Sequence, residues 1–143
     1  MTEPARWYVD SSVLVRAITD DSPAAKDWFD AASAGGDVFV ASRLMEVEVR
    51  RVTRNAGVDQ ELVGLYLDLF VFLPVDEDLM AQAIAIPRPV GGADAIHLAA
   101  AMRVGAGALK LATHDKQMAD AAPRLGFGVI DPVVDDPRRG PVA

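Results

Sequence analysis

Four acidic side chains, far apart along this sequence, have the type and local setting of residues that hold a divalent cation. Asp10, Asp94 and Asp115 each stand at the start of a predicted helix, and Glu48 lies inside a helical segment. Carboxylate oxygens are the ligands that Mg²⁺ and Mn²⁺ prefer, and Mg²⁺ is typically shared with substrate phosphates. A cation held in this way activates water and neutralises charge on a phosphate under attack. The four acids therefore indicate metal-assisted chemistry on a phosphate.

Each aspartate also has a simpler interpretation, because Asp is a good helix N-cap and is favoured in the first helical turn. Ser11 and Ser12 follow Asp10, and Thr113 precedes Asp115 by two residues. These hydroxyls can hydrogen-bond the carboxylates or the waters on a bound metal ion, or they can cap helices. The sequence leaves both possibilities open.

Glu48 falls on the apolar face of the helix predicted for residues 41–54, at 100° per residue. An ionised carboxylate is rarely buried, because its desolvation must be compensated. Glu48 therefore either belongs to a site or reaches solvent from the edge of that face. Glu46 points to the other side, where an ion pair with Arg43 or Arg50 is expected. The apolar face comprises Ala41, Leu44, Met45, Val49 and Val52.

The same helix carries a basic arc beside Glu48, made up of Arg43, Arg50, Arg51 and Arg54. The formal net charge of the chain is −7, whereas phosphate neutralisation normally dominates nucleic-acid binding and favours a basic domain. A carboxylate site that binds cations accounts for part of the acidity. The arc is either a ridge that contacts RNA phosphates or a solvated face that balances nearby acids.

Short apolar runs alternate with helical segments along the whole chain, which predicts an α/β fold. Without a hairpin signal between the runs, we expect a three-layer α/β/α sandwich around a central, mostly parallel sheet. Residues 1–132 are predicted to form one domain and residues 133–143 a loosely ordered C-terminal tail. In such sheets, ligands bind at the carboxyl ends of the strands. Strands are predicted at 7–9, 38–40, within 70–75, 109–112 and 127–130, with helices at 13–18, 23–33, 43–55, 59–69, 76–86, 92–104 and 115–122.

Several classes of protein are disfavoured by the sequence. The absence of cysteine excludes disulfides, thiolate catalysis and Cys-ligated zinc. No apolar stretch is long enough for a membrane span or a secretory signal, so a cytoplasmic protein is expected. A haloacid-dehalogenase phosphatase needs a second aspartate two residues after the first, where this chain has Ser12. A receiver-type phosphoacceptor needs a mid-chain aspartate at a strand end, which is also missing.

Four segments, in order, resemble the motifs of PIN domains. Residues 8–15 resemble the family's opening strand and aspartate, and residues 42–48 its Ser-then-Glu segment, whose spacing selects Glu48 over Glu46. Residues 93–99 resemble the Asp-Ala-x-His-x-Ala element, and residues 113–115 the Thr-x-Asp element. The length and the α/β alternation are similar to VapC-type toxins of bacterial toxin–antitoxin pairs.

This resemblance implies a Mg²⁺- or Mn²⁺-dependent endoribonuclease with Asp10, Glu48, Asp94 and Asp115 at the metal site. Water attack would leave a 5′-phosphate and a 3′-hydroxyl. The resemblance also implies a homodimer and a cognate VapB-type antitoxin whose tail blocks the site. Apolar residues proposed for the dimer contact are Leu65, Leu69 and Phe72.

The chain departs from the family pattern at His114, where aromatic residues are common, and in the loop before Asp94, which carries Arg88. His97 is three residues after Asp94 and could face it, but is expected to pack between helices. The competing hypothesis is a non-catalytic PIN-like module that binds protein or RNA and keeps the acids for folding.

Overall fold

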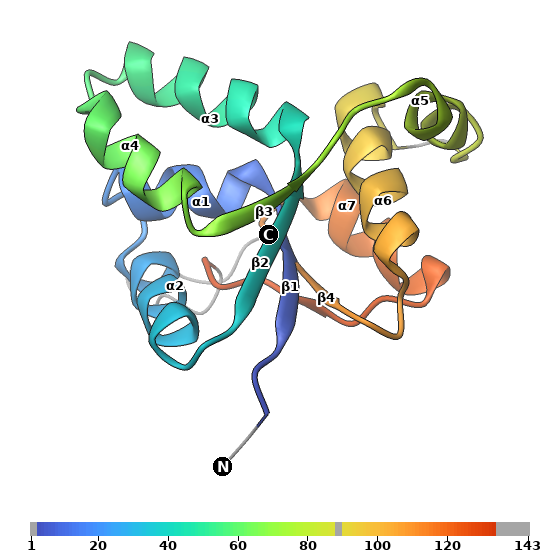
Figure 1. Cartoon of the computed structure of the whole chain (residues 1–143), viewed down its shortest axis with the longest axis horizontal. Coiled ribbons are helices and arrows are strands. Elements are labelled where there is room, and N and C mark those ends of the chain that lie inside the picture. Colours follow the sequence, from blue (N-terminus) through green and yellow to red (C-terminus); the bar gives the residue numbers. More distant parts are fainter. Residues whose placement is uncertain (1–2, 88–89, 134–143) are drawn as a thin grey trace.

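A computed structural model describes residues 3–87 and 90–133 of the chain (Figure 1). Its centre is a five-stranded sheet in the order β3-β2-β1-β4-β5, in which every neighbouring pair is parallel. This confirms the predicted α/β fold with a parallel sheet. The strands are β1 (Arg6–Val9), β2 (Val38–Ser42), β3 (Phe70–Leu73), β4 (Lys110–Ala112) and β5 (Val129–Ile130).

The strand order reverses between β1 and β4. From β1 the chain adds β2 and β3 on one side and then returns to place β4 and β5 on the other. Val9 pairs with Ala112, and the backbone N–H of Asp10 donates to the carbonyl of Ala112 at 2.9 Å. Connections leave opposite faces of the sheet at such a switch point and open a crevice at the carboxyl ends of the strands.

Helices cover both faces of the sheet and form two separate groups in Figure 1. The first group packs around one hydrophobic cluster with β1 and β2, and the second around another. Alternation along β1 divides the clusters, because Trp7 and Val9 enter the first and Tyr8 enters the second. The first group is α1 (Ser11–Ile18), α2 (Pro23–Ala34), α3 (Arg43–Asn55) and α4 (Gln60–Leu67). The second group is α5 (Glu77–Ile84), α6 (Gly92–Val104), α7 (Lys116–Ala121) and the 3₁₀ turn η1 (Ala122–Leu125).

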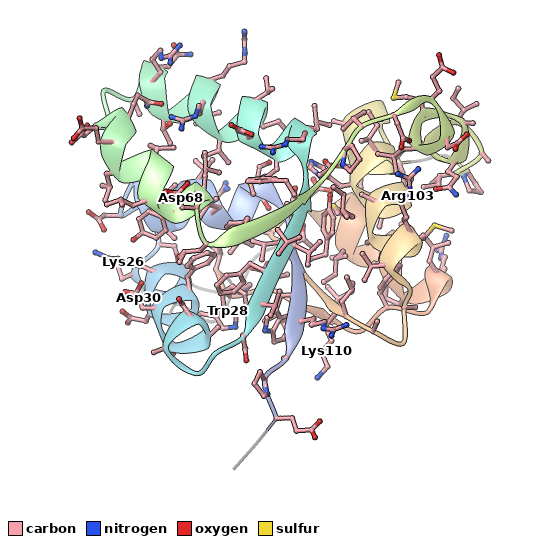
Figure 2. The ribbon with its side chains drawn as sticks, in the orientation of Figure 1. Lys26, Trp28, Asp30, Asp68, Arg103 and Lys110 are labelled. Atoms are coloured by element: carbon pink, nitrogen blue, oxygen red, sulfur yellow. The ribbon has the colours of Figure 1, made fainter. Side chains whose placement is uncertain are left out.

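Aromatic side chains fill the cluster under α2. Phe29 stacks on Phe39 with 4.3 Å between ring centroids. Trp28, labelled in Figure 2, meets Trp7 edge-on at 5.4 Å between ring centroids. At the surface of the other layer, Arg103 of α6, labelled in Figure 2, donates hydrogen bonds to both carboxylate oxygens of Asp76. The second contact joins α6, which carries Asp94, to the start of α5.

Helix starts follow the local signals of the sequence. Ser22 accepts a hydrogen bond from the N–H of Ala25, and Pro23 occupies the first turn of α2. The last predicted helix is shorter than expected, because Pro123 lacks the N–H needed to continue an α-helix and the chain turns into η1. The predicted strand at 127–130 is reduced to Val129–Ile130.

Val133, the first residue of the predicted tail, is fully buried and donates its N–H to Asp131. The rest of that tail and Arg88 lie outside the described residues. Among the helices that the structure describes, none is long and apolar enough to cross a membrane.

Candidate active site

The four acids predicted from the sequence line one open cleft of about 1020 Å³. Asp10 follows β1, and Asp115 precedes α7 after β4, so the two lie on either side of the switch point. Asp94 comes from the first turn of α6 and Glu48 from the middle of α3. Four segments distant in sequence thus bring carboxylates to one place.

Asp10 is 3% exposed, and its carboxylate is held by hydroxyl groups. Its Oδ2 accepts hydrogen bonds from Ser12 Oγ at 2.7 Å and Thr113 Oγ1 at 2.9 Å. Ser11 Oγ lies 3.5 Å from Oδ1. Although Asp10 occupies the N-cap position of α1, its side chain makes no capping hydrogen bond. Capping therefore does not explain this aspartate.

The loop after β4 orients both hydroxyls. Ser12 Oγ accepts the backbone N–H of His114 at 3.0 Å, and Thr113 Oγ1 accepts that of Asp115 at 3.0 Å. A hydroxyl carries one hydrogen, and the geometry gives that hydrogen to Asp10 in each case. This network ties the end of β1 to the end of β4.

Asp115 is a helix cap as well as a cleft residue, since its Oδ2 accepts the N–H of Met118 at 2.8 Å. Asp94 is half-buried in the same cleft. Burial raises the pKa of Asp94 to about 7, with further contributions from the charges of Asp115 and Asp10 and from a hydrogen bond with Asp115. The acids are thus close enough to disfavour one another's ionisation.

Glu48 lies at the edge of the cleft with its side chain 30% exposed. Its Oε1 lies 2.7 Å from Nε2 of His97, which is fully buried. His97 therefore packs inside the protein, as predicted, but it also contacts an acid of the cleft, and that acid is Glu48. The separation of 49 residues explains why no local pattern revealed this pair.

The apolar face of α3 is narrower than predicted. Val52 was expected on the buried face, yet it is 48% exposed and lines the cleft. The helix packs against α1 and α4 through a single ridge. The buried residues of that ridge are Met45, Val49 and Thr53.

The basic arc divides into residues with different surroundings. Arg51 lines the cleft. Arg43 donates to Glu46 at 2.7 Å and lies over the Phe72 ring, 4.9 Å from its centroid. Arg50 donates to Gln60 at 3.2 Å. Arg54 is exposed but is not among the residues that line the cleft.

Arg16 is a cleft residue that the sequence analysis missed. Its Nη1 donates to the carbonyl of Ser12 at 2.8 Å, and its Nε lies 3.7 Å from Oδ2 of Asp21, another residue that lines the cleft. The available signal was its spacing, because residue 16 follows Ser12 by four positions and so shares its helix face. Arg16 and Arg51 thus supply positive charge from two walls of the cleft.

His114, the departure from the Thr-x-Asp pattern, is engaged inside the protein. Its Nδ1 lies 2.8 Å from Oδ2 of Asp131, and both side chains are largely buried. The pair connects the loop after β4 to the segment after β5.

The chemistry of the site fits a hard divalent cation, because its candidate ligands are carboxylate oxygens whose mutual repulsion a cation would relieve. Within residues 3–87 and 90–133, however, no three His, Asp or Glu side chains are already arranged to hold a metal ion. The acids surround the cleft without forming a complete coordination shell.

Comparison with known proteins decides the family. Residues 7–123 match the sequence model of the PIN domain. The chain belongs to the PIN-domain family. This PIN domain is 34% identical over 135 residues to ribonuclease VapC46 of Mycobacterium tuberculosis (strain ATCC 25618 / H37Rv), covering 90% of this chain and 98% of the relative. It is 28% identical over 130 residues to ribonuclease VapC47 of the same species (strain CDC 1551 / Oshkosh), covering 87% and 96%.

Solved structures show the same fold at lower identity. A toxin–antitoxin complex from Klebsiella pneumoniae contains a chain with a TM-score of 0.62 and 20% identity, covering 90% of this PIN domain and 97% of that chain. VapBC2 from Rickettsia felis, bound to a DNA fragment from its promoter, gives a TM-score of 0.64 at 9% identity, covering 88% and 98%. The predicted resemblance to VapC-type PIN domains is confirmed.

Proposed function

We propose that this PIN domain is a metal-dependent endoribonuclease and the toxin of a type II toxin–antitoxin pair. The observation that carries the proposal is the cleft at the switch point, where Asp10, Glu48, Asp94 and Asp115 meet. Two relatives named as ribonucleases, each matched over nearly its whole length, support the choice of RNA as substrate.

Asp10, Glu48, Asp94 and Asp115 would hold Mg²⁺ or Mn²⁺. When bound, the cation would lower the pKa of a coordinated water and neutralise charge on the scissile phosphate. The protein contributes rigidity, because the two hydroxyls on Asp10 Oδ2 fix the direction of that carboxylate. Asp115 is fixed through its capping bond to α7.

Arg16 and Arg51 would contact the RNA backbone on either side of the scissile phosphate. Both line the cleft beside the carboxylates, and Arg side chains bind phosphate oxygens in a planar, two-pronged geometry. The cleft is itself acidic, because Asp20 and Asp21 line it together with the four candidate ligands. Bound cations would therefore have to offset this charge together with the two arginines before phosphate is attracted. Arg43, Arg50 and Arg54 would be peripheral contacts at most.

The partners follow from the same family relationship. The structural relatives include toxin–antitoxin complexes, so we propose a cognate VapB-type antitoxin that covers the cleft. We also propose a homodimer, in which exposed apolar residues of α4 and the following turn meet. Leu65 is 66% exposed and Leu69 is 46% exposed, whereas Phe72 is partly covered by Arg43. An RNA substrate and a VapB-type partner imply action in the cytoplasm.

Cleavage of RNA by the purified protein tests the proposed activity. Total RNA and short synthetic RNAs are incubated with Mg²⁺, Mn²⁺ or EDTA, and the new ends are mapped. We expect metal-dependent cuts that leave 5′-phosphates and 3′-hydroxyls, lost in Asp10→Asn and kept in Glu46→Gln, whose carboxylate faces Arg43 on the surface. Undiminished metal-dependent cleavage by Asp10→Asn would refute the assignment, and inactive wild-type protein would favour a non-catalytic binding module.

A further inference from the structure

His97 is a fully buried titratable side chain, and both of its ring nitrogens have partners. Nδ1 lies 2.8 Å from the hydroxyl of Tyr8, and Nε2 lies 2.7 Å from Oε1 of Glu48. Tyr8 comes from the middle of β1, His97 from α6 and Glu48 from α3. The imidazole therefore joins the central strand and helices from the two opposite layers.

Glu48 sets the direction of the hydrogen bond at Nε2. An ionised carboxylate only accepts, so Nε2 carries a hydrogen and donates it to Glu48. At the other side of the ring, Nδ1 faces the Tyr8 hydroxyl, whose oxygen accepts the N–H of Ser42 at 3.0 Å. Ser42 Oγ also lies 3.5 Å from Nδ1.

The resulting N–H restrains an otherwise mobile carboxylate. Glu48 reaches the cleft on a long, partly exposed side chain, and ordering such a chain costs conformational entropy. A short N–H bond to an ionised carboxylate is stronger than a bond between neutral groups. Nε2 is 3.9 Å from Oδ1 of Asp10, beyond hydrogen-bond distance, so its hydrogen goes to Glu48.

We propose that His97 is a positioning residue, which holds Glu48 at the cleft through its Nε2–H and is itself oriented by the hydrogen bond with Tyr8. The contribution to metal binding and cleavage rests on the proposed function. The bond to Glu48 stands on the geometry alone. This relay of hydrogen bonds joins the Ser42 N–H, Tyr8, His97 and Glu48.

The hydrogens of the His97 ring can be located directly by NMR in ¹⁵N-labelled, metal-free protein. The chain has two histidines, His97 and His114, so His97→Gln assigns the signals. We expect a hydrogen on Nε2 of His97, bonded to the Glu48 carboxylate. Tyr8→Phe removes the partner of Nδ1 and should shift the Nδ1 resonance. A ring whose only hydrogen is on Nδ1, or one unaffected by Tyr8→Phe, would overturn the relay.

The consequence for the site is tested with Mn²⁺ as the probe, by electron paramagnetic resonance titration alongside RNA cleavage. His97→Leu fills the space without a donor, and His97→Gln restores an N–H near the position of Nε2. We expect His97→Leu to lower Mn²⁺ affinity and cleavage by about 10–100-fold, the range for residues that orient metal ligands. His97→Gln should recover most of both, and Glu46→Gln should match wild type.

Thermal melting confirms which variants fold, and the remaining outcomes separate the claims. Folded His97→Leu with wild-type Mn²⁺ affinity and cleavage, or folded His97→Gln no better than His97→Leu, would contradict the positioning role. Wild-type protein that neither binds Mn²⁺ nor cleaves RNA would contradict the proposed function instead. In that case, the NMR result still decides whether the relay exists.

Discussion

The hydroxyl of Thr113 donates a hydrogen bond of 2.9 Å to Asp10 Oδ2, joining residues 103 positions apart at the ends of β1 and β4. The same oxygen of Thr113 accepts the backbone N–H of Asp115. One buried side chain thereby orients Asp10 and fixes the loop that carries Asp115.

Thr113→Val keeps the shape of this side chain but removes both hydrogen bonds. We expect a loss of about 1–3 kcal/mol in the free energy of unfolding. The Asp115 N–H would lose its acceptor, and the buried carboxylate of Asp10 would lose one of its donors. RNA cleavage should fall as well. Denaturant unfolding measures the first effect. Thr19→Val is the matched control, since the Thr19 hydroxyl only bonds back to the carbonyl of Val15; equal losses in the two variants would contradict this role.

Asp94 predicts a dependence of stability on pH in the metal-free protein. The folded state raises the pKa of this carboxyl from 3.8 to about 7, so it binds a proton more tightly than the unfolded state does. The free energy of unfolding should therefore fall as the pH rises through this interval and level off above it. In EDTA, Asp94→Asn should remove this decline, so that its advantage in Tm over wild type grows from pH 5 to pH 8.

Asp76→Asn provides the control for that series. Its hydrogen bonds with Arg103 and the Leu79 N–H lower the pKa of Asp76 to about 2, so its contribution is complete above about pH 4 and is lost only as the pH falls toward 2. Asp76→Asn should therefore run parallel to wild type between pH 5 and pH 8. Parallel curves for wild type and Asp94→Asn over the same range would show that crowding of the acids does not affect stability.

The secondary structure could be predicted because its signals are local. Ser22 with Pro23 marks the start of α2, and each strand is a short apolar run. The positions of Asp10 and Asp115 followed from the strands that precede them. The bond between His97 and Glu48 could not be found in this way, because it depends on how α3 and α6 meet across the sheet. The exposure of Val52 was missed for the same reason, since only packing sets the width of a buried face.

The position of Arg51 in the cleft leads to a prediction about how RNA binding depends on salt concentration. Each phosphate contact contributes about 0.7 to the slope of log affinity against log salt for a single strand. In the Asp10→Asn background, we expect Arg51→Ala to weaken binding of a fluorescent single-stranded RNA and to reduce the slope by about this amount. Arg124→Ala, an exposed arginine on η1 outside the cleft, should leave the slope unchanged. Equal slopes for the two variants would show that Arg51 does not contact the RNA backbone.

The exposed position of Leu65 leads to a prediction about the oligomeric state. If the exposed residues of α4 form the proposed dimer, Leu65→Glu places buried charge in the contact and should halve the mass measured by light scattering, to one 15.2 kDa chain. Ile84→Glu, at an 83% exposed position on α5, should remain dimeric. A monomeric Ile84→Glu variant with a dimeric Leu65→Glu variant would indicate that the dimer contact lies on α5.

Binding of Mn²⁺ to the purified protein, followed by electron paramagnetic resonance, measures whether the acids of this cleft hold a metal ion. We expect saturable binding by wild-type protein that is retained in Glu46→Gln and lost or greatly weakened in Asp10→Asn and Asp94→Asn. Wild-type protein that binds Mn²⁺ no better than these two variants would contradict a metal site built from the acids of this cleft.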